Sequence, residues 1–309
     1  MTRPGIYWEF SRPFTLIPPM TGIFSGALIG IAVARPAFPF LPVVLAVIAA
    51  AILNAGSNGL NQIFDLPNDL INKAHRPLPA GRMTCREAWV FSLVAYFLAL
   101  ALAAAVNPQT FLIYLAAALA TVFYSAPPFR LKRRPWASNF TIALARGELL
   151  KVAGWASVAT VIGSWEPWYI GFIYFLFLMG ATTTKDFADV EGDRRAGCET
   201  LPVKYGAVKS ARLISPAFIV PWLVMALGVF LKVLSGNGPA ILVLCAVMLV
   251  WGIWVVALIN RDSSGLASEG ENHPAWRQMY WMMMAGHLGL AGAYLIGFVG
   301  SARATGMLR

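Results

Sequence analysis

Two stretches of the sequence carry acidic and amide side chains at the spacing of one helix face. Their members are Asn61, Asp65 and Asp69 in the first, and Asp186, Asp189 and Asp193 in the second. Residues three, four or eight positions apart lie on the same side of a helix. Carboxylates at this density repel one another unless a cation lies between them, and oxygen ligands are those that Mg²⁺ prefers. The spacing therefore predicts a magnesium site shared by both stretches.

Basic residues adjoin these acidic stretches and a third segment at 130–134. Those predicted to bind an anionic substrate are Lys73, Arg76, Arg130, Lys132, Lys185 and Arg194. Guanidinium and ammonium groups bind diphosphate oxygens, and Mg²⁺ commonly bridges carboxylates to a phosphate. The alternative is that basic residues only set the orientation of the chain in a membrane, and we favour it for Arg133, Arg134 and Arg195.

The chain that must position these groups is strongly apolar. Of its 309 residues, 58% are hydrophobic and only 12% are charged, whereas soluble domains are about 25% charged. A soluble protein of this composition would lack the polar surface to cover itself. Three Cys and three His without metal-ligand spacing indicate neither a disulfide framework nor a zinc site. We therefore predict an all-α polytopic membrane protein.

Apolar segments of about 20 residues, the length that crosses a bilayer, recur along the whole sequence. The predicted spans are 14–34, 40–63, 87–106, 109–127, 138–161, 167–187, 210–231, 238–259 and 276–300. Nine spans around a central cavity form a single transmembrane domain over residues 1–309. In this arrangement both acidic stretches lie at the same mouth of the bundle.

The distribution of positive charge predicts the orientation of the chain. With the N-terminus in the cytoplasm, most of the 24 Lys and Arg residues fall on the cytoplasmic side, as the positive-inside rule requires. The C-terminus then lies on the opposite side of what we expect to be a bacterial inner or intracytoplasmic membrane. This pattern explains the sequence pI of about 9.8 without nucleic-acid binding, so lipids are the expected surroundings.

An apolar bundle whose mouth binds magnesium and diphosphate predicts a substrate with a charged head and a hydrophobic tail. A polyprenyl diphosphate has this form. Its ionisation gives an allylic carbocation, and cations stabilise the diphosphate on which negative charge develops.

Three sequence segments resemble the signatures of the UbiA superfamily of intramembrane prenyltransferases. They are the first acidic stretch with NKAHRPLPAG after it, YSAPPFRLKRR at 124–134, and KDFADVEGDRRAGCETLPVKYG at 185–206. The resemblance covers about residues 10–210. The motifs look most like the branch of chlorophyll and bacteriochlorophyll synthases and homogentisate prenyltransferases, and archaeal digeranylgeranylglyceryl phosphate synthases share the VEGD and TLP elements.

The resemblance implies roles for individual residues. Both acidic stretches would hold Mg²⁺ on the prenyl diphosphate, and Lys73, Arg76 and Lys132 would hold the diphosphate itself. Tyr124 lies where the family places an aromatic ring near the reaction centre, although an interfacial anchor is an equally good interpretation of this residue.

Charged residues in the fifth predicted span depart from the chlorophyll synthases. ARGELLKVAGW carries Arg146, Glu148 and Lys151, and ionisable residues inside a membrane indicate a functional site. We predict that Arg146 and Lys151 bind an acceptor with a carboxylate or phosphate. The alternative is that Glu148 pairs with Lys151 and that Arg146 extends towards the interface. Gln62, beside Asn61, also departs from the Asn-Asp pair usual in the tetrapyrrole branch.

The sequence thus predicts magnesium-dependent transfer of a prenyl group to a lipophilic or aromatic acceptor, such as a tetrapyrrole or homogentisate. Three alternatives remain open. They are an ether-lipid prenyltransferase resembling digeranylgeranylglyceryl phosphate synthase, a terpene cyclase of the same superfamily, and a transporter of an anionic lipid. Transporters place charged sites near the membrane midplane, whereas the acidic stretches here lie at one mouth.

Overall fold

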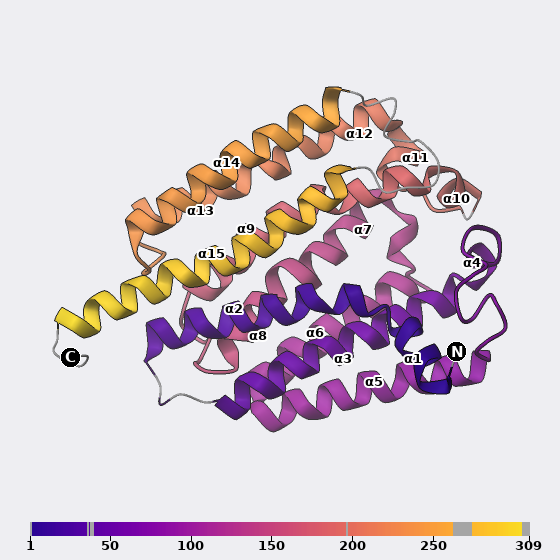
Figure 1. The fold of residues 1–309 in the computed structure, drawn as a ribbon, viewed down its shortest axis with the longest axis horizontal. Coiled ribbons are helices and arrows are strands. Elements are labelled where there is room, and N and C mark those ends of the chain that lie inside the picture. The colour runs from indigo at the N-terminus through magenta and orange to yellow at the C-terminus, as the bar shows by residue number, and fades with distance from the viewer. Residues whose placement is uncertain (1, 36, 38–39, 196, 262–273, 305–309) are drawn as a thin grey trace.

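The computed structural model is a bundle of long helices with shorter helices gathered at one end (Figure 1). It describes residues 2–35, 37, 40–195, 197–261 and 274–304. Within these ranges all regular structure is helical. The prediction of an all-α protein is therefore confirmed.

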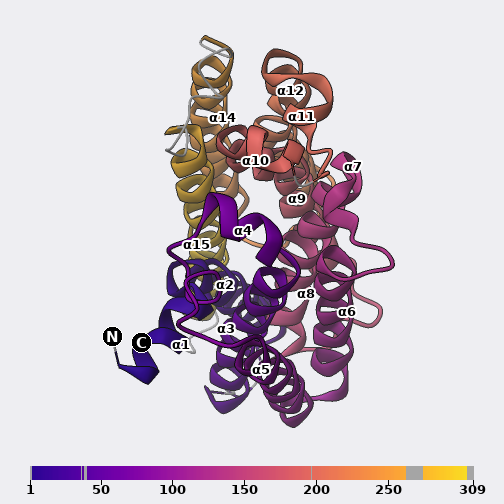
Figure 2. The same ribbon diagram turned by 90° about the vertical axis from the view of Figure 1, so that its right-hand side faces the viewer.

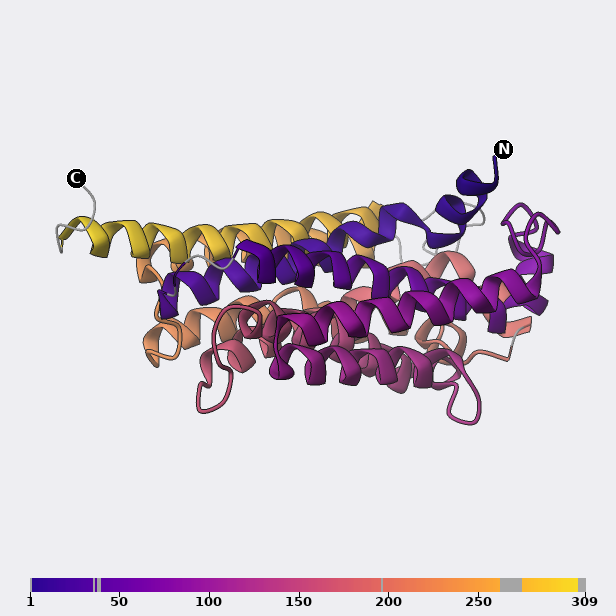
Figure 3. The ribbon, with the colours of Figure 1, turned by 90° about the horizontal axis from the view of Figure 1, so that it is seen from below.

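Seven helical stretches of the described chain are long and apolar enough to cross a membrane. They comprise η1 with α2 (Pro13–Leu16, Ile17–Ala34), α3 (Phe40–Phe64), α5 (Cys85–Val106), α6 (Pro108–Ser125), α12 with η5 and α13 (Ala207–Ile214, Ser215–Phe218, Val220–Phe230), α14 (Gly238–Arg261) and α15 (Pro274–Ala304). Figure 3 shows α1 (Arg3–Ser11) at one end of the bundle and the last turns of α15 at the other. The chain is a polytopic membrane protein.

Two of the predicted spans, 138–161 and 167–187, are not among these seven. The first is the helical run of α7 (Pro135–Ile142), the π-helix η3 (Ala143–Glu148) and α8 (Leu149–Ala156), which carries three charged side chains. The second is α9 (Glu166–Ala181), whose 16 residues extend only about 24 Å, less than the hydrocarbon core of about 30 Å. Nine membrane crossings therefore stay a prediction.

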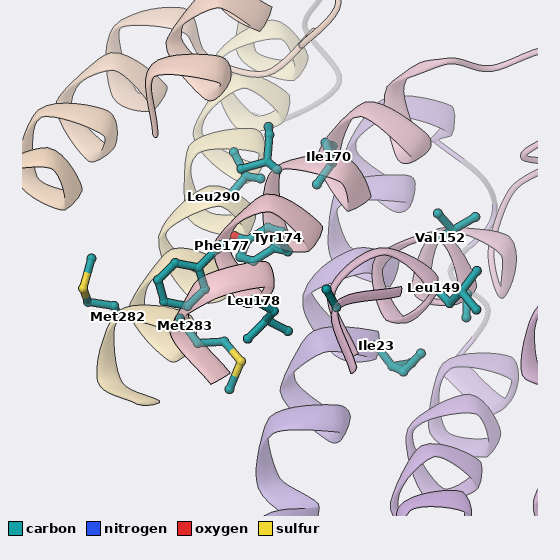
Figure 4. Close-up of a cluster of buried hydrophobic side chains, with 14 of the residues drawn as sticks. Ile23, Leu149, Val152, Ile170, Tyr174, Phe177, Leu178, Met282, Met283 and Leu290 are labelled. Carbon is teal, nitrogen blue, oxygen red and sulfur yellow. The ribbon is translucent and has the colours of Figure 1, made fainter. Parts of the chain in front are cut away.

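The hydrophobic core lies where α9 packs against α15 and its neighbours. Tyr174 and Phe177 of α9 are completely buried, and α15 contributes Met282, Met283 and Leu290 to the same cluster (Figure 4). Helix α3 lines both of the cavities described below.

Glycine allows α2 and α8 to approach closely. A Cβ atom on Gly154 would lie 2.3 Å from the carbonyl oxygen of Ile23, and one on Gly26 would lie 2.7 Å from that of Lys151. Because backbone cannot move aside, Gly154→Ala should destabilise the protein by about 1–3 kcal/mol and lower its Tm in detergent. Gly292→Ala is the control, since its Cβ would meet nothing within 4 Å. Equal Tm values would contradict this contact.

Short helices close one end of the bundle. Figure 2 looks onto this end, where α4 (Leu66–Asn72) lies beside α10 (Val190–Arg195), and the two are in contact. Helix α4 contains Asp69 of the first acidic stretch, and α10 contains Asp193 of the second. The fold thus brings the two stretches together, although more than 100 residues separate them.

Candidate active site

A polar cavity of about 100 Å³ lies between the two acidic stretches. All six residues of the predicted magnesium site line it, namely Asn61, Asp65, Asp69, Asp186, Asp189 and Asp193. Five other predicted site residues also line it: Lys73, Arg76, Tyr124, Lys132 and Lys185. Eleven of the site residues predicted from the sequence therefore line one cavity.

The spacing predicted one continuous helix for the first acidic stretch, but the structure divides this stretch between two helices. α3 ends at Phe64, Asp65 has φ −96° and ψ 1°, and α4 begins at Leu66. Pro67 explains the break, because it has no N–H to donate and its ring clashes with the carbonyl four residues earlier. The break turns α4 across the mouth, and Asp65 and Asp69 still face the same cavity.

The second acidic stretch is also divided between two elements. Asp186 and Asp189 belong to the 3₁₀-helix η4 (Thr182–Asp189), whereas Asp193 lies in α10. A 3₁₀-helix has three residues per turn, so side chains three apart are aligned along it. The spacing of three that suggested one face of an α-helix is therefore satisfied by a tighter helix.

Basic side chains pair with three of the carboxylates. Asp65 accepts a short hydrogen bond from Lys132 Nζ, and Arg130 Nη2 lies 3.6 Å from the same carboxylate. Arg76 Nη1 lies 2.7 Å from Asp69 Oδ2. Lys73 Nζ lies 3.4 Å from Asp189 Oδ2. The predicted diphosphate-binding cations and the predicted metal ligands are thus direct neighbours.

Two predicted diphosphate-binding residues are placed differently from the others. Arg194 is exposed, and its guanidinium lies 3.5 Å from Glu191 Oε2, on the outer side of α10. Arg130 donates to the carbonyl oxygen of Phe64 at 2.8 Å and sits behind Asp65. Neither residue lines the polar cavity; Arg130 reaches its edge only through Asp65, and Arg194 does not contact it.

Arg12 lines the polar cavity, although its sequence position suggested only a role in membrane orientation. It adopts φ 57° and ψ 64° between α1 and η1, the left-handed conformation that costs a non-glycine residue roughly 1–2 kcal/mol. Burial lowers the pKa of its guanidinium to about 10, with Arg76 and Arg146 adding to the effect. An arginine followed by proline does not by itself reveal this conformation.

The oxygen-rich lining fits a bound Mg²⁺ with its water and substrate ligands. Within the described residues no three His, Cys, Asp or Glu side chains converge as a preformed metal cluster, and Lys or Arg side chains pair with Asp65, Asp69 and Asp189. The lining holds five Asp and five Lys or Arg residues, so their formal charges cancel. A diphosphate, which brings about three negative charges, therefore requires added cations.

A second, apolar cavity of about 40 Å³ lies deeper in the bundle. α3 lines both cavities, with Ser57 in the apolar one and Asn61, one turn further along, in the polar one. Arg146 also lines the apolar cavity, in the π-helix η3, and its Nη2 donates to Asn54 Oδ1 at 2.8 Å. π-Helical turns frequently occur at functional sites.

Lys151, the other predicted acceptor-binding residue, does not line either cavity. It is 2% exposed, donates to Ser25 Oγ at 2.5 Å, and lies 4.8 Å from the ring centre of Tyr174. Glu148 forms no ion pair with it among the described residues. Lys151 therefore contributes to packing between α2, α8 and α9, and of the two predicted acceptor-binding residues only Arg146 lines a cavity.

Comparison with known proteins identifies the family of this chain. Residues 23–268 match the model of the UbiA prenyltransferase family. The chain belongs to this family. It is a prenyltransferase embedded in a membrane.

Similar proteins of the family have different names. The chain is 30% identical over 262 residues to digeranylgeranylglyceryl phosphate synthase of Methanopyrus kandleri, which covers 82% of this chain and 92% of that protein. It is also 30% identical to the bacteriochlorophyll synthase 34 kDa chain of Chloroflexus aurantiacus, over 54% of this chain and 53% of that protein. Because these identities are equal, no single branch of the UbiA family is favoured.

The fold matches that of a UbiA homolog from Archaeoglobus fulgidus whose structure contains GPP and Mg²⁺. The TM-score is 0.74 at 22% identity, and the match covers 94% of this chain and 99% of the other. The helical bundle described above is thus a UbiA fold.

Acid should weaken metal binding to this UbiA protein. Burial raises the pKa of Asp193 to about 6 against the opposing charge of Lys185, and the charge of Asp189 raises it further. Below this pH Asp193 holds a proton, which competes with a cation. The Mg²⁺ concentration for half-maximal turnover should therefore rise as the pH falls from about 7 to about 5, and the rise should be smaller in Asp193→Asn. The same Mg²⁺ requirement at both pH values would contradict this role.

Proposed function

We propose that this UbiA protein transfers the prenyl group of a polyprenyl diphosphate to a lipophilic or ring-containing acceptor that carries an anionic group. The observation that carries the proposal is the pair of cavities that share α3. One is polar and lined by five Asp and five basic residues, and the other is apolar. In this proposal the polar cavity receives the diphosphate head, and the apolar cavity marks the direction in which the prenyl tail enters the bundle.

The basic residues of the polar cavity bind the donor diphosphate in this proposal. Lys73, Arg76 and Lys132 leave their carboxylate partners for the phosphate oxygens, and Lys185 and Arg12 complete the set. As the C–O bond of the donor breaks, negative charge grows on the departing diphosphate. Positive groups bound to the phosphate oxygens stabilise this growing charge in the transition state more than in the ground state.

The residues that would hold Mg²⁺ are Asn61, Asp65, Asp69, Asp186, Asp189 and Asp193. When bound, Mg²⁺ would neutralise charge on the diphosphate and so make it a better leaving group. The apolar cavity would exclude water from the allylic cation, which water would otherwise convert to an alcohol. Tyr124, which lines the polar cavity, would present its ring to that cation.

Arg146 would bind the acceptor. It is a cation in an apolar cavity with an amide rather than a carboxylate partner among the described residues, so an acceptor carboxylate or phosphate would complete its pairing. With saturating donor, Arg146→Leu should raise the acceptor KM by at least about tenfold and leave the donor KM unchanged. Lys151→Leu is the comparison, since Lys151 lines neither cavity. An unaltered acceptor KM in Arg146→Leu would exclude this role.

The test of the function is mass spectrometry of products from the purified protein. It is supplied with geranyl, farnesyl or geranylgeranyl diphosphate and with chlorophyllide, homogentisate, hydroxybenzoate or a prenylglyceryl phosphate. A product heavier than the acceptor by one prenyl group supports the proposal. A cyclised hydrocarbon formed from donor alone supports the cyclase alternative instead. The absence of any covalent product with every pair would refute prenyl transfer to these acceptor classes.

We also propose that the mouth faces the cytoplasm. Most basic residues of the loops lie at the same end as the polar cavity, which supports an N-terminus inside the cell and a C-terminus outside it. The helical runs of residues 135–156 and 166–189 would then be the fifth and sixth of nine crossings.

A further inference from the structure

Three buried amide side chains run along one face of α3. Asn54, Asn58 and Gln62 are four residues apart, and they are 6%, 5% and 1% exposed. We call these three residues the amide ladder. Amides removed from water are costly unless they form hydrogen bonds. Each of the three side chains donates a hydrogen bond to the N-terminal segment that contains Arg12.

Two side chains of the amide ladder donate hydrogen bonds to the backbone just before Arg12. Gln62 Nε2 donates to the carbonyl oxygen of Phe10 at 2.9 Å. Asn58 Nδ2 donates to the carbonyl oxygen of Ser11 at 2.9 Å. The two carbonyls that end α1 are thus fixed to α3, where a free helix end would leave them without partners.

Thr15 connects the amide ladder to Arg12 itself. The carbonyl oxygen of Arg12 accepts from Thr15 N at 2.9 Å and from Thr15 Oγ1 at 2.8 Å. The same hydroxyl accepts from Asn58 Nδ2 at 2.7 Å and from Asn54 Nδ2 at 3.2 Å. One hydroxyl has one donor and two acceptor positions, so every hydrogen-bonding position of the Thr15 hydroxyl is filled.

These contacts explain how Arg12 keeps a conformation that its side chain disfavours. Residues held in the left-handed region persist only where their surroundings fix them, and they concentrate at functional sites. Here the carbonyls of residues 10, 11 and 12 are all bound, and the chain turns sharply between α1 and η1. The turn directs the guanidinium of Arg12 into the polar cavity.

We propose that the amide ladder is a set of positioning residues for the donor site, acting through Arg12. The inference rests on the proposed function, in which Arg12 binds the donor diphosphate. It also gives Gln62 a role: this residue does not line the polar cavity and instead fixes the segment that enters it. Asn54 extends the same connection to Arg146, from which its Oδ1 accepts a hydrogen bond at 2.8 Å.

A double-mutant cycle tests the proposal. Binding of geranyl diphosphate with Mg²⁺ is measured by calorimetry for wild type, Arg12→Gly, Gln62→Met and the double variant. Glycine removes the guanidinium but favours the left-handed conformation, so Arg12→Gly should fold. We expect each single variant to weaken binding by about tenfold or more, and the double variant to bind no more weakly than Arg12→Gly. Asn58→Leu replaces Gln62→Met if that variant does not fold.

Gln109→Leu is the control for loss of a hydrogen-bonding amide. Gln109 Nε2 donates to Thr160 Oγ1 at 3.1 Å, in the loop region at the opposite end of the bundle, so donor binding should be unchanged. Unaltered donor affinity in Gln62→Met, or additive losses in the double variant, would overturn the proposal, even if Tm falls. Failure of wild type to bind geranyl diphosphate would instead refute the proposed function. Normal binding by Arg12→Gly beside lost binding by Asp189→Ala would refute only this inference.

Discussion

Replacing Asp189 by alanine is expected to lower the rate of prenyl transfer by at least about 100-fold while the protein stays folded. Asp189 lines the polar cavity, and its carboxylate lies 3.4 Å from Lys73 Nζ. Its loss would remove a proposed metal ligand and leave Lys73 without its partner, so we expect the diphosphate to be bound in the wrong position. Product formation by mass spectrometry, at equal amounts of folded protein, measures the effect.

Glu191→Ala is the matched control for this substitution. Glu191 lies two residues away on α10, but it is exposed and pairs with Arg194 and Arg195 rather than lining the cavity. Its loss should leave the rate within about twofold of wild type. Equal effects of the two substitutions would show that negative charge near the mouth, rather than the cavity itself, supports turnover.

Removal of divalent cations is expected to stop turnover completely. The formal charges of the cavity lining already cancel, so a diphosphate would enter without enough positive charge to balance it. Treatment with EDTA should abolish product formation, and an excess of Mg²⁺ should restore it. The donor should also bind much more weakly in EDTA.

Potassium or sodium at matched ionic strength is the control for general charge screening. These ions screen exposed charges but do not bridge carboxylates and phosphate with the geometry of Mg²⁺. Restoration of turnover by monovalent salt alone would contradict a requirement for the metal. Full turnover in EDTA would exclude the metal-dependent mechanism altogether.

Sequence patterns predicted the class of the fold and most of the polar cavity. Apolar runs separated by charged loops allow few structures other than a helical membrane bundle, so the all-α fold followed directly. The spacing of Asp65 and Asp69, and of Asp186 and Asp189, identified side chains that do face one space. This worked because residues four apart share a face in an α-helical turn, and residues three apart are aligned in a 3₁₀-helix.

Features that depend on tertiary contacts could not be predicted in the same way. Arg12 reaches the cavity because a left-handed residue turns the chain, and this conformation depends on hydrogen bonds from α3, far along the sequence. Lys151 lies close to Arg146 in sequence, and the sequence predicts the same role for both residues. The helix turns their side chains in different directions, so only Arg146 lines the apolar cavity. The break at Asp65 could have been predicted from Pro67, whose effect on a helix is local.

The most direct test of the central claim is an experimental structure of this protein with geranyl diphosphate and Mg²⁺. The polar cavity is predicted to contain the diphosphate between the two acidic stretches, with Lys132 moved from Asp65 to a phosphate oxygen. The prenyl tail is predicted to extend along α3 towards Arg146. A diphosphate bound outside this cavity, or a tail lying away from the apolar cavity, would contradict the proposed site.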